Sequence, residues 1–363
     1  MFYLWDAGIR PTHDSQFQTT FHWDVDLLSG YEHEFVPNVA ASPGTHRFGG
    51  LHNPQLSRRL ASWKPSVILL FGYKSRAQLG VIKWAKLRRV PLIFRGDSHL
   101  LGRTRGAFAS RLALRILYAQ FAAITYVGAA NRDYFSALGV PAEKLFFAPH
   151  AVDADLFHPD RKETLAAAAA LRVQLRLAAA TRVVLFAGKL VAAKQPRELL
   201  QAFLSLRFDH AALVFVGDGE EQAALLDLAR NAPPGTVHIL PFANQSAMPA
   251  YYAMADIFVL PSRGVYETWG LAVNEAMRMG RPCLVSDRVG CQRDLVTDGE
   301  TGWVFHADDP AHLREKLTAA LNADLSTYQL GVRTRIARYS YEQTTTGLLA
   351  AITAVARMQA GKM

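Results

Sequence analysis

Short apolar, β-prone runs alternate with helix-prone stretches along most of this 363-residue chain. In the first half, the runs that predict strands are 66–72, 91–96, 123–128 and 144–153. In the second half they are 182–188, 212–219, 237–242, 256–262 and 282–287. Helical patterns separate most of these runs, and this alternation is typical of parallel sheets flanked by helices.

A polar, proline-containing stretch at 155–160 separates the two series, and an alanine-rich helix is predicted after it around 164–177. A chain of this length favours two domains over a single core. We therefore predict a first doubly wound domain at 1–158, a second at 159–340, and a C-terminal helix at 341–363 that could pack back on the first domain. Two such domains facing each other would place their strand ends at a shared cleft.

Loops that follow strands of the second domain carry groups suited to an anion. Gly188 ends the run at 182–188, and Lys189 and Lys194 follow in the next loop. The helix after the strand at 256–262 should begin near 268–270, where its free N–H groups favour negative charge. Two lysines and a helix N-terminus would hold a diphosphate without a metal ion.

Two acids lie at this last strand–loop–helix junction. Glu275, in the body of the predicted helix, could accept hydrogen bonds from the vicinal hydroxyls of a ribose. Glu267, in the loop, would face whatever is attached to the far side of the diphosphate. The alternative is that both acids only cap or solvate a surface helix. The neighbouring lysines and glycine, and the position after a strand, favour ligand binding.

The stretch 261–305 resembles the C-terminal signature of family-four retaining glycosyltransferases with the GT-B fold. That pattern has two glutamates separated by seven residues, an aromatic–Gly pair after the first, and Gly-x-Pro before the next strand. This chain supplies Glu267, Trp269–Gly270, Glu275 and Gly280–Pro282. The lysine loop also matches, with a lysine at the first position where the family usually has arginine. The resemblance covers roughly 182–310.

The resemblance implies a GT-B fold, with two facing Rossmann-like domains and an interdomain cleft, and it implies roles for particular residues. The residues it implies for binding the donor are Gly188, Lys189, Lys194, Phe242, Thr268, Trp269, Gly270, Leu271 and Glu275. Among them the lysines would bind the diphosphate, Glu275 the ribose and Phe242 the base. Near the reacting sugar, the catalytic candidates are His99, Asp97 and Glu267.

The N-terminal part of the chain resembles the family less. Residues 1–28 contain no clean strand pattern. The glycine loop that the family places near the donor phosphates has two candidates here, Gly8 and Gly49–Gly50. The aromatic residues of this region could line an acceptor pocket, although core packing is favoured for them. They are Trp5, Phe17, Phe21 and Trp23.

The formal net charge of +9 is concentrated in the first half. Between 55 and 115, Asp97 is the only acid, and the basic residues are Arg58, Arg59, Lys64, Lys74, Arg76, Lys83, Lys86, Arg88, Arg89, Arg95, Arg103, Arg105, Arg111 and Arg115. This pattern predicts a positive face for an anionic membrane or a phosphorylated carrier, with a plain solvated surface as the alternative. Nucleic acid is disfavoured because no binding motif accompanies the charge.

Cysteine content and hydropathy bear on the compartment. The two cysteines, Cys283 and Cys291, form no zinc-binding pattern, and we expect both to be buried small residues. The N-terminus has no basic region typical of a secretory signal, and no apolar stretch is long enough to span a bilayer. We therefore expect a soluble, cytoplasmic protein that could bind peripherally to the inner face of the cell membrane.

The function predicted from the sequence is a metal-independent, retaining hexosyltransferase without a cofactor. Its donor would be a nucleoside-diphosphate sugar, with a UDP-sugar favoured. Its acceptor would be a cell-envelope polysaccharide, a lipid-linked glycan or a small secondary metabolite. Two alternatives are a GT-B nucleotide-sugar epimerase and a catalytically silent scaffold that binds sugar nucleotides.

Overall fold

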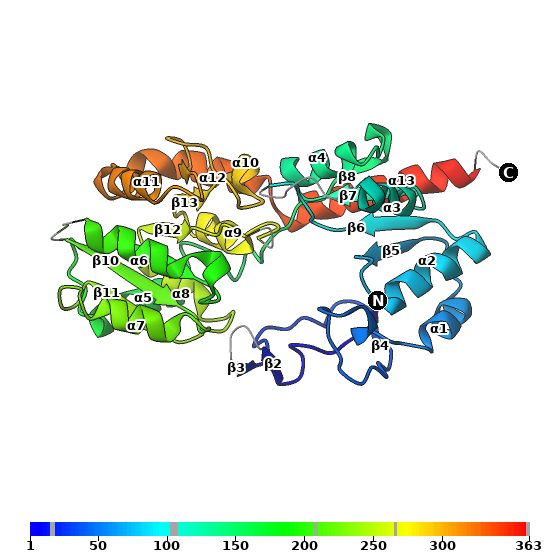
Figure 1. Cartoon of the computed structure of the whole chain (residues 1–363), viewed down its shortest axis with the longest axis horizontal. Coiled ribbons are helices and arrows are strands. Elements are labelled where there is room, and N and C mark those ends of the chain that lie inside the picture. The colour runs from blue at the N-terminus through cyan, green and yellow to red at the C-terminus, as the bar shows by residue number, and fades with distance from the viewer. Residues whose placement is uncertain (15–18, 102–107, 207, 209, 265–266, 361–363) are drawn as a thin grey trace.

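The computed structural model describes residues 1–14, 19–101, 108–206, 208, 210–264 and 267–360. Two α/β domains lie side by side along the long axis of the molecule (Figure 1). The chain passes from the first domain to the second after β8 (Leu145–Phe147), and its last helix returns to the first. Within the described ranges, no helix is both long and apolar enough to cross a membrane.

The main sheet of the first domain is parallel and has the strand order β5-β6-β7-β8. Its other strands are β5 (Ile68–Phe71), β6 (Leu92–Arg95) and β7 (Ala123–Tyr126). The helices of this domain are α1 (Leu56–Trp63), α2 (Arg76–Arg88), α3 (Phe108–Tyr118) and α4 (Ala129–Ala137), with 3₁₀ turns η1 (Phe48–Gly50) and η2 (Ala142–Lys144). These strands confirm the predictions made for this half of the chain.

Short strands precede this sheet, which corrects the expectation of no strand in the first 28 residues. β1 (Phe2–Tyr3) pairs in parallel with β4 (Glu34–Phe35). β2 (Thr12–Asp14) pairs antiparallel with β3 (Thr19–Phe21). Strands of two or three residues have no readable alternation, and they form here because of the partners that the fold brings to them.

The second domain contains a fully parallel sheet with the order β11-β10-β9-β12-β13-β14. Its strands are β9 (Arg182–Ala187), β10 (Ala211–Val216), β11 (Val237–Leu240), β12 (Ile257–Leu260), β13 (Cys283–Ser286) and β14 (Gly302–Phe305). All but β14 were predicted. The chain builds outward from β9 through β10 to β11 and then returns to the other side of β9. Ligands of such sheets bind beyond the strand ends where the order reverses, here between β9 and β12.

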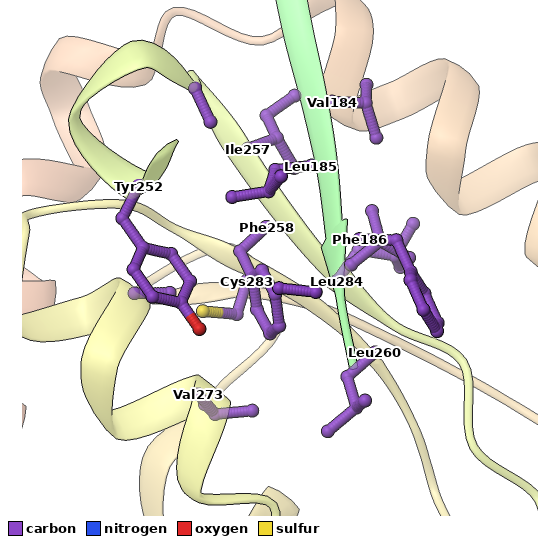
Figure 2. Close-up of a cluster of buried hydrophobic side chains, with 14 of the residues drawn as sticks. Val184, Leu185, Phe186, Tyr252, Ile257, Phe258, Leu260, Val273, Cys283 and Leu284 are labelled. Carbon is purple, nitrogen blue, oxygen red and sulfur yellow. The ribbon is translucent and has the colours of Figure 1, made fainter. Parts of the chain in front are cut away.

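Helices cover both faces of this sheet. They are α5 (Lys162–Gln174), α6 (Pro196–Ser205), α7 (Gln222–Ala229), α8 (Met248–Met254), α9 (Leu271–Arg278), α10 (Gln292–Leu295), α11 (Pro310–Asn322) and α12 (Gln329–Ala337), with 3₁₀ turns η3 (Ala192–Lys194) and η4 (Leu325–Tyr328). Figure 2 shows Leu185, Phe258 and Leu284 of the central strands packed with Tyr252 of α8 and Val273 of α9. Cys283 and Cys291 are free and buried, as expected.

The last helix, α13 (Tyr341–Ala360), packs on β7 and β8 of the first domain. Ala351 and Val355 of α13 join a buried cluster with Ile93 and Ala123. Gly347 lies so close to the Phe147 carbonyl oxygen that a Cβ atom there would collide with it. The helix therefore ties the end of the second domain to the sheet of the first.

Candidate functional site

A cavity of about 490 Å³ lies beyond the carboxyl ends of β9 and β12, at the reversal in strand order. The second domain supplies most of its wall, including Gly188, Lys189, Lys194, Phe242, Gln245, Tyr252, Glu267, Gly270, Leu271 and Glu275. The first domain supplies Asp14, Phe21 and Trp23. Most of the residues that the resemblance implied for donor binding therefore share one cavity.

Each of the two lysines in the cavity wall is paired with a carboxylate. Lys194 Nζ lies 2.8 Å from Glu267 Oε2, which also accepts a hydrogen bond of 2.8 Å from the Ser262 hydroxyl. Lys189 Nζ lies 2.8 Å from Asp14 Oδ2 of the first domain. All four charged side chains are largely buried, and their charges balance. An anion that binds both lysines must compete with these carboxylates.

The N-terminus of α9 opens onto the same cavity. Gly270 caps the helix with φ +95°, and a Cβ there would lie 2.8 Å from Val289 Cγ1. Glycine is therefore required at this position by both its backbone conformation and its neighbours. The first N–H groups of a helix have no intrahelical acceptor, so the start of α9 presents donors and a partial positive charge to the cavity.

Glu275 is a buried acid in the cavity wall. Its side chain accepts hydrogen bonds from Gln245 Nε2, at 3.1 Å on Oε1, and from the Tyr252 hydroxyl, at 2.7 Å on Oε2. Burial raises the pKa of Glu275 above its ordinary value, although both hydrogen bonds act to lower it. A carboxylate has about four acceptor sites, so Glu275 retains capacity for ligand hydroxyls.

Asp97 lies where the two domains meet. It follows β6, and its Oδ2 accepts a hydrogen bond of 2.8 Å from Thr268 Oγ1 of the second domain. His150 Nε2 lies 3.6 Å from the same oxygen. Partial burial acts to raise the pKa of Asp97, but the hydrogen bonds from His150 and Thr268 bring it below its ordinary value. Asp97 and Thr268 lie outside the cavity lining.

His99 is completely buried at the same junction. Its Nδ1 accepts the Leu101 N–H at 3.1 Å, so in the neutral ring Nε2 carries the proton. Nε2 then donates to the backbone carbonyl of Glu267 at 3.2 Å. The ring therefore contacts the loop that carries Glu267 and is not part of the cavity wall.

Trp269 also lies between the domains and outside the cavity lining. Its indole N–H donates to Asn274 Oδ1 at 2.8 Å, and its ring packs edge-on against His150 with ring centres 5.9 Å apart. The Trp269 ring also packs at a tilted angle against the Tyr339 ring, with ring centres 5.8 Å apart. The aromatic residue of the motif thus supports the interface between the domains with its side chain.

The first domain differs from the sequence-based expectations in several places. Phe21 and Trp23 line the cavity, which corrects the expectation that they pack in the core. The ring centre of Phe21 lies 5.6 Å from that of Phe242. Asp14 was not anticipated at all. Neither glycine candidate, Gly8 or Gly49–Gly50, lines the cavity. Phe17, Arg103 and Arg105 lie outside the described residues.

Across the described parts of the chain, no group of three His, Cys, Asp or Glu side chains is arranged to hold a metal ion. Cations in the cavity wall are supplied by Lys189 and Lys194. Signals for Gly188, Lys189, Lys194 and Glu267 were readable from the sequence because these residues lie at or after the ends of strands. Signals for Asp14, Gln245 and Tyr252 were absent, since these residues reach the cavity only through the fold.

Two family models match this chain. The model described as "Glycosyl transferases group 1" matches residues 168–343, and the one described as "Glycosyl transferase 4-like domain" matches residues 32–151. The chain belongs to the group 1 glycosyltransferases. The two models together cover most of both domains. They confirm the family that the sequence motifs resembled.

Curated relatives and solved structures agree with this assignment. A D-inositol 3-phosphate glycosyltransferase of Geodermatophilus obscurus is 31% identical over 61% of this chain and 50% of its own. A GDP-mannose-dependent phosphatidylinositol monomannoside mannosyltransferase of Mycobacterium tuberculosis is 34% identical over 50% of this chain and 48% of its own. The matched part of the chain thus spans about half the length of these relatives.

A crystal structure of Anabaena HepE, in complex with UDP and glucose, has the same fold. It superposes with a TM-score of 0.68 and 19% identity, over 89% of this chain and 86% of that one. Its identity to this chain is low, so the likeness concerns the architecture. The predicted GT-B arrangement of two α/β domains is confirmed.

Proposed function

We propose that this chain transfers a sugar from a nucleoside-diphosphate sugar to an acceptor hydroxyl, with retention of the anomeric configuration. The observation that carries the proposal is the single cavity in which two lysines, the start of α9 and two glutamates meet. Cations and N–H donors suit a diphosphate, and a buried carboxylate suits ribose hydroxyls. A site for a simple anion would not require a buried carboxylate such as Glu275 in its wall.

In this proposal, Lys189, Lys194 and the first N–H groups of α9 stabilise the diphosphate as it leaves. Negative charge grows on the leaving phosphate while its bond to the sugar breaks, so preorganised cations lower the barrier without a metal ion. The activity should therefore persist in the presence of EDTA. A strict requirement for magnesium or manganese would contradict this part of the proposal.

Glu267 would bind a hydroxyl of the donor sugar and would not act as a nucleophile. Its carboxylate shares the wall with Lys194, on the side of the leaving phosphate. A nucleophile would have to approach from the opposite face of the sugar. The acceptor oxygen instead bonds to the anomeric carbon on the face that the phosphate leaves, and its proton passes to a phosphate oxygen. Such a reaction needs positioning and charge stabilisation and no protein base.

Asp97 and His99 would position this machinery from the first domain. Asp97 binds Thr268, and His99 holds the Glu267 carbonyl. These two contacts between the domains would thus set the position of the loop that carries Glu267. We expect His99→Ala to lower turnover more than donor affinity, because the ring orients a loop that contacts the sugar.

The donor and acceptor classes follow less directly from the cavity. A UDP-sugar is our first choice, and the GDP-mannose dependence of the mycobacterial relative makes a guanine nucleotide the main competitor. The relatives named above act on an inositol phosphate and on a phosphatidylinositol mannoside. A phosphate-bearing or lipid-linked polyol would suit the first domain, because its basic surface attracts anionic groups.

A lipid-linked acceptor would require contact with a membrane surface, and α3 offers an exposed apolar stripe for it. Phe108, Leu112 and Ile116 follow one another at four-residue spacing, and Phe108 is 83% exposed. Arg111 and Arg115 flank them. We propose that this helix docks on an anionic bilayer. Replacing the three apolar residues with serine should reduce binding to anionic vesicles, whereas equal binding to neutral vesicles would contradict the idea.

The decisive experiment combines donor binding with product analysis. A thermal-shift panel of UDP, GDP and their sugars would identify the base, since a ligand at a hundred times its dissociation constant adds about 2.7 kcal/mol of stability. Transfer is then followed with inositol phosphate and mannoside acceptors, and NMR gives the anomeric configuration of the product. An inverted product would rule out retention. Donor isomerisation without acceptor would indicate the epimerase, and binding without turnover the scaffold.

Variants of Glu267 separate binding from nucleophilic attack. Glu267→Gln should keep part of the activity because an amide still hydrogen-bonds a hydroxyl, whereas Glu267→Ala should lose far more. Glu220→Gln, which changes an exposed glutamate of the same domain, is the matched control and should behave as wild type. A covalent sugar adduct trapped on Glu267 would show that the proposed mechanism is wrong.

A further inference from the structure

The segment that carries β2 and β3 extends from the first domain onto the second. Figure 1 shows both strands on the side of the first domain that faces the second domain. Beyond β3, the His22 carbonyl accepts a hydrogen bond of 2.6 Å from Asn244 Nδ2. Asp24 accepts hydrogen bonds from Ser246, one of them from the backbone N–H at 3.1 Å. The segment is therefore anchored next to the cavity through polar contacts.

Aromatic contacts fix the same segment from within. Phe21 packs edge-on against Trp23, with ring centres 5.0 Å apart, and also against Phe242 of the second domain. The backbone N–H of Trp23 donates to the Gly8 carbonyl at 2.8 Å. Gly8 has φ +77°, and a Cβ there would lie 2.6 Å from the indole. These contacts place Phe21 and Trp23 at the cavity wall and bring Asp14, on the paired strand β2, within reach of the lysine loop.

Asp14 places a negative charge inside a cavity that is suited to anions. Its carboxylate lies 2.8 Å from Lys189 Nζ, and the two side chains are only 24% and 26% exposed. Both residues line the cavity. A phosphate that approaches Lys189 would meet the carboxylate at close range, where two like charges repel each other. Asp14 and a phosphate therefore compete for one ammonium group.

We propose that Asp14, at the end of β2, is a clasp on the cavity: it holds Lys189 when no donor is bound, and the donor diphosphate displaces it. This inference rests on the proposed function, since it takes Lys189 as a ligand of the diphosphate. The protein then exists in a paired and an unpaired form, and only the unpaired form offers the full charge of Lys189. The apparent affinity for a diphosphate is reduced by the fraction of protein that is paired.

The clasp has an unusual consequence for mutagenesis. Removing a charged residue from a binding site ordinarily weakens binding, but removing the Asp14 carboxylate should strengthen it. A partly exposed ion pair is worth up to about 1 kcal/mol, which corresponds to about a fivefold change in affinity. Asp14→Asn should therefore bind inorganic pyrophosphate and UDP about fivefold more tightly than wild type. The same substitution keeps the size of the side chain and its capacity to accept hydrogen bonds.

Isothermal titration of the full chain with pyrophosphate and with UDP tests this prediction. Asp6→Asn is the control, because Asp6 is an acid of the same segment that pairs with Arg10 at 3.2 Å and does not line the cavity. Its affinity should equal that of wild type. Asp14→Ala is the second variant, and it should also bind more tightly. Urea unfolding of each variant shows that it is folded before affinities are compared.

An affinity of Asp14→Asn and Asp14→Ala equal to that of wild type, or lower, would overturn the clasp. A lower affinity would mean that Asp14 helps to hold the ligand. Lys189→Ala distinguishes this failure from failure of the proposed function. If Lys189→Ala loses pyrophosphate binding while the Asp14 variants do not gain it, the clasp alone is wrong. If Lys189→Ala binds as wild type does, the diphosphate site itself is wrong.

Discussion

The two domains contribute to the cavity in different ways. In the second domain, the loop after β9 and the junction between β12 and α9 are continuous strand–loop–helix units, and each carries its functional residues within a few positions. In the first domain, Asp14, Phe21 and Trp23 reach the cavity from the strands β2 and β3 and the residues after them, which are far from their partners in sequence. The second domain therefore presents a local anion site, and the first domain covers and orients it.

The contacts between the domains show the same division. Asp97 and His99 of the first domain bind Thr268 and the Glu267 carbonyl, which belong to the loop before α9. On the other side of the interface, the Asp294 carboxylate accepts the Ala129 N–H at the start of α4. Changes in the second-domain residues of the cavity wall should thus affect the ligand directly, whereas changes in the contacts between the domains should act through position. The following predictions test this contrast.

The largest effect is expected from Lys194→Ala. It removes a cation from the site of the developing phosphate charge, and loss of such a stabiliser costs about 3 kcal/mol, or about a hundredfold in rate. Steady-state transfer rates measure it, with Lys162→Ala as the control because Lys162 is exposed at the start of α5. If His99→Ala caused a larger loss than Lys194→Ala, the contrast between the domains would be reversed.

The next effect concerns the helix that joins the domains. Gly347→Ala places a methyl group against the Phe147 carbonyl and should lower the free energy of unfolding by about 2 kcal/mol. Gly80→Ala, in the middle of α2 with no atom near its Cβ, should raise that free energy by about 0.5 kcal/mol. Urea unfolding measures both. A Gly347→Ala protein as stable as wild type would show that α13 is not tightly docked on β8.

A smaller effect is expected from Thr268→Val at the interface. This change keeps the shape of the side chain and removes its hydrogen bond to Asp97, which should cost about 1.5 kcal/mol, or about tenfold in transfer rate. Nucleotide affinity should change less than the rate. Thr318→Val is the control, because Thr318 lies on the exposed face of α11. Equal losses in rate and affinity would place Thr268 among the direct ligand contacts.

The smallest effect concerns the pH dependence that Glu275 introduces. Burial raises its native pKa above the ordinary 4.5, so the folded protein binds this proton more tightly than the unfolded chain does. The resulting stabilisation is complete below that ordinary value and is lost as the pH rises through the raised native pKa. Wild type should therefore lose stability relative to Glu275→Gln across this interval, as measured by urea unfolding. A difference that is constant, or that grows with pH, would contradict the burial effect.

Much of the second domain was readable from sequence because its signals are local. Five of its six strands follow from apolar runs, and β14 was missed because Gly302–Phe305 begins with glycine and follows a polar, turn-prone stretch. The residues Gly188, Lys189, Lys194 and Glu275 were placed in the cavity by one rule, that ligands bind beyond the ends of parallel strands. The resemblance to the glycosyltransferase family implied a donor-binding role for the same residues. Local periodicity and a fixed sheet geometry were sufficient here.

The tertiary structure decided what the first domain does. Phe2 and Glu34 pair across the sequence, and Asp14 meets Lys189 at a separation of 175 residues. Burial of His99 and the inward direction of Phe21 and Trp23 likewise depend on the second domain. An isolated short strand or a lone aromatic residue has no preferred partner until the fold is closed. Pairing, burial and charge compensation over such distances are set by packing, because only packing supplies the partner.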